Sequence, residues 1–519
     1  MAEPNRGQGL NDNKQLRKHE TIYLLQFRFF RKILNMKNRR AIAVLICTLL
    51  YSFLFFHQHA GVNFLLFSVV SLTFLGWNHK QIFTQKIGQI LIVMVLFAAT
   101  FVFIHGSLFA VWVNVLLLML LSAYCYRQHG SVPINFLSSV YSVVFSPVFV
   151  LLNLQSKNNK GLNKNFLKYL VIIFPLVFGL IFFAIYKNAN PLFEKFTRDI
   201  NLNFISKDWT IFTFGGFLLM YGFYYHQRIT AVDALEDSQV TDLKNKDYPA
   251  TKWNEKTAAV ILFVLLNGML LFINLLDLNY LYLGAGMPDG FTHKQFVHDG
   301  VGNLVFSIVL GIVLILYFFR GLLNFEPKNQ WIRILVYAWI AQNVFMVFST
   351  YLRHNLYVFD GLLSYKRIGV YYWLFMSAVG LITTAIMLYK TKSWWYLIKV
   401  NSNIALLILV LSCSLDWDQL ISNFNLGHTR RDNIAALDKH YLLSLSETNI
   451  SALYAIKDEP GFEVDSPYSY KESTYPSNKN WLDQKRLKFL EKHSKADWRS
   501  YSIREARIFN EVSILQKAE

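Results

Sequence analysis

Three charged residues at intervals of seven lie between two long apolar runs: Arg353, Asp360 and Arg367. If this stretch continues as a helix from the preceding run, residues seven apart fall on nearly one face, at about 3.6 residues per turn. A carboxylate flanked by two guanidinium groups would stay ionised and hold helices in register, because Arg forms planar bidentate pairs. The alternative is a turn at Asp360-Gly361, with both arginines extending to lipid phosphates. We predict a structural site, with a ligand or partner site as the alternative.

The loop of residues 277–300 carries a second group of side chains that could do chemistry. His293, His298 and Asp299 could bind a metal ion together with nearby aspartates such as Asp277. Imidazole and carboxylate are ordinary zinc ligands, but their spacing here matches no compact metal motif. A structured or re-entrant loop is therefore the favoured interpretation, and a metal site is the alternative.

A third candidate is the segment Asp497-Trp498-Arg499 near the C-terminal end. Asp497 could cap a helix that follows it, and Arg499 could pair with Glu447 or Glu505. Packing within a C-terminal domain is the favoured interpretation, and a docking surface for a soluble protein partner is the alternative. Phosphate-loop, dinucleotide, serine-hydrolase and zinc-protease fingerprints do not occur in a fitting structural context, so we predict no cofactor.

The composition places these residues in a membrane protein. The chain of 519 residues is 54% hydrophobic and 16% charged, whereas soluble domains carry about 25% charged residues. Apolar stretches near the ~20 residues that cross a bilayer recur along the chain. The predicted spans are 41–56, 60–76, 87–103, 107–126, 167–186, 209–226, 257–276, 301–319, 334–350, 368–389 and 399–414. The three cysteines lie in or beside these stretches with no close pair, so they are predicted to be neither disulfides nor metal ligands.

The distribution of Lys and Arg predicts the topology. Residues 132–154 are long enough to span, but they contain two prolines and four serines. If they do not span, the connectors on one side hold 28 Lys and Arg against 8 on the other; if they do, the totals are 21 and 15. The positive-inside rule favours eleven spans, an interfacial or re-entrant 132–154, a cytoplasmic N-terminus and an extracytoplasmic C-terminal tail. Because the net charge of +18 is spread over these connectors and the N-terminal arm, nucleic acid is not an expected partner.

The fold class expected is all-α: a polytopic integral membrane helix bundle with a small helical soluble C-terminal domain. Residues 227–256 are polar, and we predict a mobile connection there. The predicted parts are a basic N-terminal arm (1–40), four-helix membrane hairpins (41–131), the interfacial or re-entrant segment with its loop (132–166), a core membrane domain (167–414) and the helical C-terminal domain (415–519).

Several separated stretches together resemble one family. The matching elements are the segments 186–196, 278–304, 420–426, 437–446 and 497–507, with Ser349, Arg353, Leu356, Tyr357, Gly361, Leu362 and Arg367. From about 165 to 507 these elements follow one another in an order that resembles that of a family of bacterial multi-pass membrane proteins. The family is known as domain of unknown function four-one-seven-three, close to the set numbered four-one-five-three. Asn190, His354, Asp360 and Leu363 depart from that pattern, and the first four spans match it only in hydropathy. The resemblance implies the architecture and brings no established activity, substrate or catalytic residue.

These observations leave three functional hypotheses. A non-enzymatic scaffold or signal-coupling subunit of the bacterial cytoplasmic membrane is favoured, with the lipid bilayer and a protein at the C-terminal domain as partners. A transporter of a small solute is the alternative, since the chain has many spans and a glycine-rich loop. However, acidic residues are absent between Glu20 and Glu194, and ion-coupled transporters usually carry an ionisable residue at membrane depth. A membrane enzyme with an outer-face His/Asp site is the third hypothesis.

Overall fold

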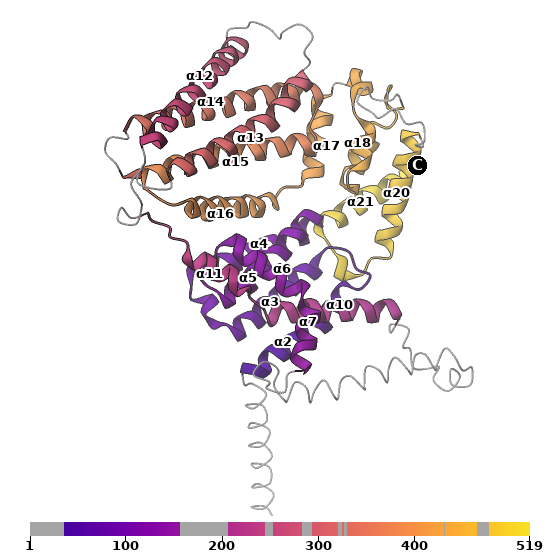
Figure 1. Ribbon diagram of the computed structural model, residues 1–519. Helices are drawn as coiled ribbons and strands as arrows, with labels where there is room; N and C mark the ends of the chain where they lie inside the picture. Colours follow the sequence, from indigo (N-terminus) through magenta and orange to yellow (C-terminus); the bar gives the residue numbers. More distant parts are fainter. Residues whose placement is uncertain are drawn as a thin grey trace, which may run out of the picture.

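The computed structural model confirms that the chain is built of helices. It describes residues 36–155, 206–243, 253–282, 293–319, 324–325, 330–429, 431–463 and 477–518. Two helical bundles lie next to each other, and a C-terminal domain of shorter helices lies beside both (Figure 1). Within these described ranges there is no β-strand, only an isolated backbone bridge between Asp242 and Lys392.

The first bundle contains the N-terminal helices. Its members are α2 (Met36–Phe55), α3 (Val62–Asn78), η1 (Lys80–Phe83), α4 (Lys86–His105), α5 (Leu108–Tyr126), α6 (Val132–Val144), α7 (Ser146–Gln155), α10 (Lys207–Tyr224) and α11 (Thr230–Ser238). Buried Val, Leu and Ala side chains form its core. Across this core Ser68 donates to Asn114, which donates to the Val95 carbonyl, joining α3, α5 and α4. Such hydrogen bonds hold helices together where lipid supplies no hydrophobic force.

Helix α10 packs in the first bundle, although its residues fall inside the predicted core domain 167–414. Met220, Phe223 and Tyr224 belong to the first hydrophobic core. A Cβ at Gly222 would lie 2.8 Å from the Ser142 carbonyl oxygen, so only Gly lets α10 approach α6 this closely. The boundary predicted at 167 therefore differs from the packing, because hydropathy does not say which helices are neighbours.

The segment 132–154 is two helices and not one. α6 has 13 residues and α7 has 10, with a break at Phe145. Pro133 and Pro147 lie near the first residue of each helix, where a missing N–H is tolerated. Neither helix reaches the ~20 residues that a span needs. An interfacial or re-entrant position for this segment stays a prediction.

The second bundle contains α12 (Trp253–Tyr282), α13 (His293–Phe318), α14 (Gln330–Gly361) and α15 (Tyr365–Tyr389), and α16 (Trp394–Ser412) lies between the two bundles (Figure 1). α12 and α14 run parallel. Asn267 donates to the Leu335 carbonyl and Asn274 to the Gln342 carbonyl, both 68 residues further on, and Gln342 donates to Asn267. These hydrogen bonds between polar side chains and the neighbouring helix hold α12 against α14.

The C-terminal domain comprises α17 (Trp417–His428), η5 (Arg431–Ala436), α18 (Lys439–Ser444), η6 (Glu447–Asn449), α19 (Ile450–Tyr454), α20 (Asn478–Ser494), η7 (Trp498–Ser500) and α21 (Ile503–Ala518). Ser477 caps α20 by accepting from the backbone N–H of Asn480. The domain has a core of its own, which includes Phe462, Phe489 and Val512.

Six helices in the described residues are long and apolar enough to cross a membrane: α4, α5, α12, α14, α15 and α16. The chain is thus a multi-pass membrane protein. Ten of the eleven predicted spans fall on described helices, and 167–186 lies outside the described residues. Shorter apolar helices include α3 and α6.

The connectors gather at two ends of the bundles. One end holds connectors from the side predicted to be rich in Lys and Arg, and we call it the basic face. There Gln128 bonds to Gln81 and Gln85, Arg127 contacts α11, and Lys392 pairs with Asp242. At the opposite face, which we call the C-terminal face, the turns after α2, α4 and α14 contact the C-terminal domain. Connectors that the positive-inside rule groups together therefore lie together.

This arrangement predicts the labelling of two exposed carboxylate positions. Asp237 is 72% exposed at the basic face and Asp458 is 74% exposed on the C-terminal domain. Cysteines introduced there, Asp237→Cys and Asp458→Cys, should react with an impermeant maleimide from opposite sides of a sealed vesicle. The three natural cysteines are buried and give the background. Labelling of both positions from one side would contradict the arrangement.

Candidate functional site

Arg367 stabilises a tight turn between α14 and α15. α14 ends at Gly361 and α15 begins at Tyr365. Between them Leu362 has a φ of 65°, a left-handed conformation that is rare for a side chain of this size. The Arg367 guanidinium donates to the carbonyls of Gly361 and Leu362, and it lies 4.3 Å from the centre of the Tyr357 ring. Arg367 thus satisfies the carbonyls that the end of α14 leaves open.

Because the chain turns at Gly361, Arg353, Asp360 and Arg367 do not lie in one helical row. The chain therefore adopts the turn at Asp360-Gly361, which was the alternative to a continuous helix. Nη2 of Arg353 instead lies 3.2 Å from Oδ2 of Asp277 on α12 and 3.0 Å from Oγ1 of Thr350. Asp360 is exposed near the end of α14. Arg353 therefore links α14 to α12, and Arg367 shapes the next turn.

His354, which departs from the family pattern, joins the same turn to α15. Its side chain is fully buried, with Nε2 2.9 Å from the Arg367 carbonyl oxygen and the ring 4.6 Å from that of Tyr371. Tyr371 donates to Asn355. The stretch 349–373 thus consists of two helices joined by a tight turn, and polar contacts on both sides fix the turn.

The predicted metal candidates fall in or beside an undescribed loop. The backbone of His293, His298 and Asp299 lies in the first two turns of α13, and their side chains are outside the described residues. Residues 283–292 are also outside them. Asp277 pairs with Arg353. Among the described residues, no three His, Cys, Asp or Glu side chains come together as metal ligands.

The α14–α15 turn forms an interface with the C-terminal domain, and we call this interface the seat. Asn425 of α17 accepts from the Leu363 N–H at 2.6 Å and donates to the Leu363 carbonyl at 3.0 Å. Val358, Leu363 and Ile368 belong to the hydrophobic core of the C-terminal domain. Because core side chains of the membrane hairpin and the domain interdigitate, the two pack as one unit.

Asp418 adds polar contacts to this seat. Its Oδ1 accepts from the Tyr365 hydroxyl at 2.6 Å, and its Oδ2 accepts from the Ser446 N–H at 3.2 Å. The Tyr365 N–H donates to the hydroxyl of Tyr441 at 3.0 Å. The first residue of α15 is thereby held by two separate parts of the C-terminal domain.

The same domain also holds the first bundle. Ser500 accepts from the His59 N–H at 2.9 Å and donates to Gln58 at 2.7 Å. Arg499 donates to the Phe53 carbonyl. The prediction that Arg499 pairs with Glu447 or Glu505 is wrong, because its guanidinium pairs with Asp497 of its own turn.

One carboxylate joins three parts of the chain. Asp416, between α16 and α17, pairs with Arg504 of α21, and its Oδ2 lies 4.0 Å from Nδ1 of His105 at the end of α4. The other ring nitrogen of His105 lies 3.2 Å from the Ser414 carbonyl. The side chains of Asp416 and Arg504 are only 12% and 11% exposed, so each depends on the other for compensation of its buried charge.

Two buried lysines stabilise the C-terminal domain. Lys439 is fully buried and donates to three carbonyls, those of Ile434, Ala435 and Gly461. Lys485 donates to the carbonyls of Leu443 and Leu445 and to Asn449. Burial lowers the pKa of the Lys485 ammonium to about 8. Each ammonium uses its three donors inside the protein, which compensates in part for lost hydration.

A second junction lies at the basic face, where a mobile connection was predicted. Arg127 approaches Asp233 at 2.5 Å, Glu236 at 3.0 Å and Asp237 at 2.6 Å, all on α11, and Arg228 pairs with Asp233. The prediction missed this helix. The sequence did indicate a helix here, because Asp233, Glu236 and Asp237 are spaced so that their side chains fall on one helical face. Beyond α11, Ser393 donates its N–H to the Thr241 carbonyl at 2.9 Å, which ties the connection to the start of α16.

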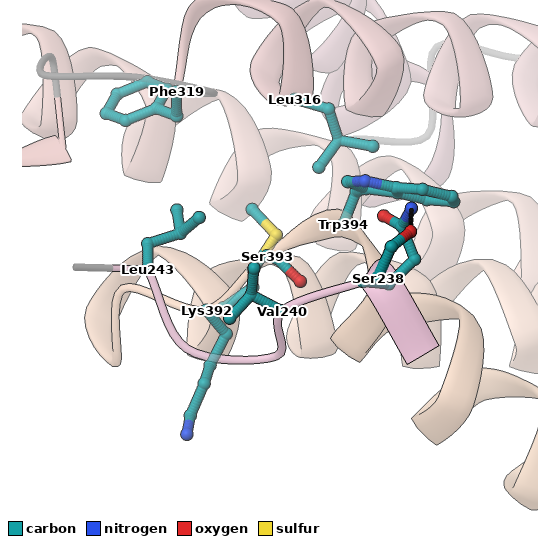
Figure 2. A pocket seen from close by; sticks show the side chains of 10 residues that line it. Ser238, Val240, Leu243, Leu316, Phe319, Lys392, Ser393 and Trp394 are labelled. Atoms are coloured by element: carbon teal, nitrogen blue, oxygen red, sulfur yellow. Dashed lines mark hydrogen bonds between the residues drawn. The ribbon is translucent and has the colours of Figure 1, made fainter. Parts of the chain in front are cut away.

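A cavity of 260 Å³ lies behind this connection (Figure 2). Its apolar lining includes Val240, Leu316, Phe319, Met387 and Trp394. Figure 2 shows the Lys392 side chain extending away from the other lining residues. Its ammonium pairs with Asp242. Ser238, Gln239, Lys392 and Ser393 also line the cavity, so its walls are mixed and indicate no particular ligand.

Comparison with known proteins gives one match. A family model described as "Domain of unknown function (DUF4153)" matches residues 64–456. The match begins in α3 and ends after α19, so it starts well before the predicted 165 and stops before the predicted 507. It thus includes the seat, Asp416 and α11. No curated protein and no solved structure matches the chain.

Asn425→Ala should loosen the seat of the C-terminal domain. The substitution leaves the buried N–H and carbonyl of Leu363 unpaired, at a cost of about 2 kcal/mol or roughly a 30-fold change in an equilibrium. Amide hydrogen exchange around Leu363 should accelerate accordingly. Asn423→Ala, at an exposed position of the same helix, is the control. Equal exchange in both variants would disprove the role of Asn425.

Lys485 should make the domain more stable as pH rises. Its pKa falls from 10.5 to about 8 on folding. Between these values the unfolded chain binds more protons, so the free energy of unfolding increases from pH 8 to 10.5. Lys485→Met should lack this increase relative to the exposed Lys488→Met. Urea denaturation of the full chain, followed by a fluorophore on Asp458→Cys, measures it. Parallel pH profiles for the two variants would contradict the assignment.

Proposed function

We propose, from the premise that the chain belongs to the DUF4153 domain-of-unknown-function family, that this multi-pass membrane protein is a non-enzymatic signal-coupling subunit. Its C-terminal domain transmits the relative position of the two helical bundles to a protein partner. The observation that carries the proposal is the meeting of Asp416, Arg504 and His105. These residues come from the end of α16, the C-terminal domain and the first bundle.

The geometry supports coupling because the domain contacts each bundle separately. Asn425 holds the second bundle at Leu363, and Ser500 holds the first at His59. A displacement of either bundle would have to strain the domain or break these contacts, since packed interfaces switch between discrete arrangements. The buried carboxylate of Asp416 makes the arrangement specific, because separating it from Arg504 leaves charges uncompensated.

The proposal includes an orientation in the cytoplasmic membrane. The basic face, with its N-terminal arm, lies in the cytoplasm, and the C-terminal domain lies outside. The asymmetry of 28 against 8 Lys and Arg residues supports this. The maleimide experiment on Asp237→Cys and Asp458→Cys tests it, since Asp237→Cys should then react only from the cytoplasmic side.

Spin labels on the two bundles test the coupling. Leu108 in the first bundle and Phe359 in the second are 72% and 60% exposed near the C-terminal face. In vesicles of the full chain, pulsed electron resonance between labels at these positions should give one narrow distance distribution. Asp416→Asn keeps a cap for α17 and removes the charge that pairs with Arg504, so the distribution should broaden.

Asp458→Asn, at an exposed carboxylate, is the matched control and should leave the distribution narrow. A photoreactive residue at the exposed Leu487 of α20 gives the second readout, because a partner cross-link in the native membrane should weaken in Asp416→Asn at equal protein amount. An unchanged distance distribution in Asp416→Asn would refute the coupling, and an unchanged cross-link would refute transmission to a partner.

A further inference from the structure

A groove of 490 Å³ opens between α4 and α16, where the two bundles meet within the apolar length of the protein. Its walls are almost entirely hydrocarbon: Ile90, Val93, Met94 and Phe97 from α4, and Leu407, Val410 and Leu411 from α16. Val93 is 65% exposed and Leu411 54%. The groove belongs to neither junction described above, and it holds no polar group at its apolar end.

The polar end of the groove carries a cation. Lys86, the first residue of α4, lines the groove together with Gln89. No acidic residue occurs between Glu20 and Glu194, so helices α2 to α7 supply no carboxylate. Within the described parts of the chain, Lys86 has no acidic partner. An anion from outside the protein would complement this charge.

The dimensions match one leaflet of a bilayer. Lys86 and Phe97 are separated by eleven residues of α4, or about 16 Å of helix at about 1.5 Å per residue. Half of a hydrocarbon core of about 30 Å is about 15 Å. An acyl chain whose headgroup lies at Lys86 would therefore fill the groove as far as Phe97.

We propose that the α4–α16 groove binds one anionic phospholipid, with an acyl chain against Val93 and Leu411 and the phosphate at Lys86. Basic residues beside grooves between membrane helices select anionic headgroups. The lipid fills the apolar part of the groove and so joins the two bundles at membrane depth. The protein retains it more tightly than the surrounding lipid. This site does not depend on the coupling function.

Native mass spectrometry of the full chain tests the proposal. In mild detergent the wild-type protein should retain one phosphatidylglycerol in preference to phosphatidylethanolamine. Val93→Trp fills the groove and should abolish retention of the lipid. Lys86→Gln should reduce the preference for phosphatidylglycerol about fivefold, the contribution of one Lys near an anionic headgroup, and keep binding of the chain.

Matched controls separate these effects from loss of structure. Val69→Trp, at an exposed position of α3, and Lys80→Gln, at the same basic face, should both behave as the wild type. Retention of lipid by Val93→Trp, or an unchanged headgroup preference in Lys86→Gln, would overturn the proposal. Displacement of the lipid by inorganic phosphate alone would replace it with a simple anion site. Disulfide formation between two copies carrying Val93→Cys would assign the groove to a second copy.

Discussion

The buried pair of Asp416 and Arg504 is the interaction on which the arrangement of the three parts depends. Helices that cross a bilayer satisfy their own backbone, so lipid leaves the two bundles free to separate. Specific joining must come from polar contacts at the membrane surfaces or from close packing. At Asp416 a charge with little access to water obtains its counter-ion from another part of the chain, next to His105 of the first bundle. Removing either partner would leave a buried charge uncompensated.

Polar contacts at both faces contrast with apolar contact between them. At the basic face Arg127 holds α11 through three carboxylates, and at the C-terminal face Asn425 holds the α14–α15 turn. Between these two levels α16 contacts the first bundle through Leu406, Val410 and Cys413. Apolar packing of this kind has little directional preference. The directional contacts that join the parts therefore lie at the two ends of the bundles.

Much of the architecture could be predicted from the sequence, because lipid imposes a simple rule on composition. Ten of the spans predicted from apolar length coincide with described helices, and six of these helices are long and apolar enough to cross a membrane. Partners far apart in sequence could not be predicted. Arg353 pairs with Asp277 on a parallel helix, and hydropathy carries no information on which helices are neighbours. The acids of α11 had a helical spacing, but their partner Arg127 directly follows α5, about a hundred residues earlier in the chain.

The position of the joining residues along the chain bears on how the protein is made. Arg504 and Ser500 leave the ribosome after every described membrane helix has been synthesised. Until then the contacts of Asp416 with Arg504 and of His59 with Ser500 cannot form. The contacts of the first bundle with η7 and α21 therefore form only at the end of synthesis.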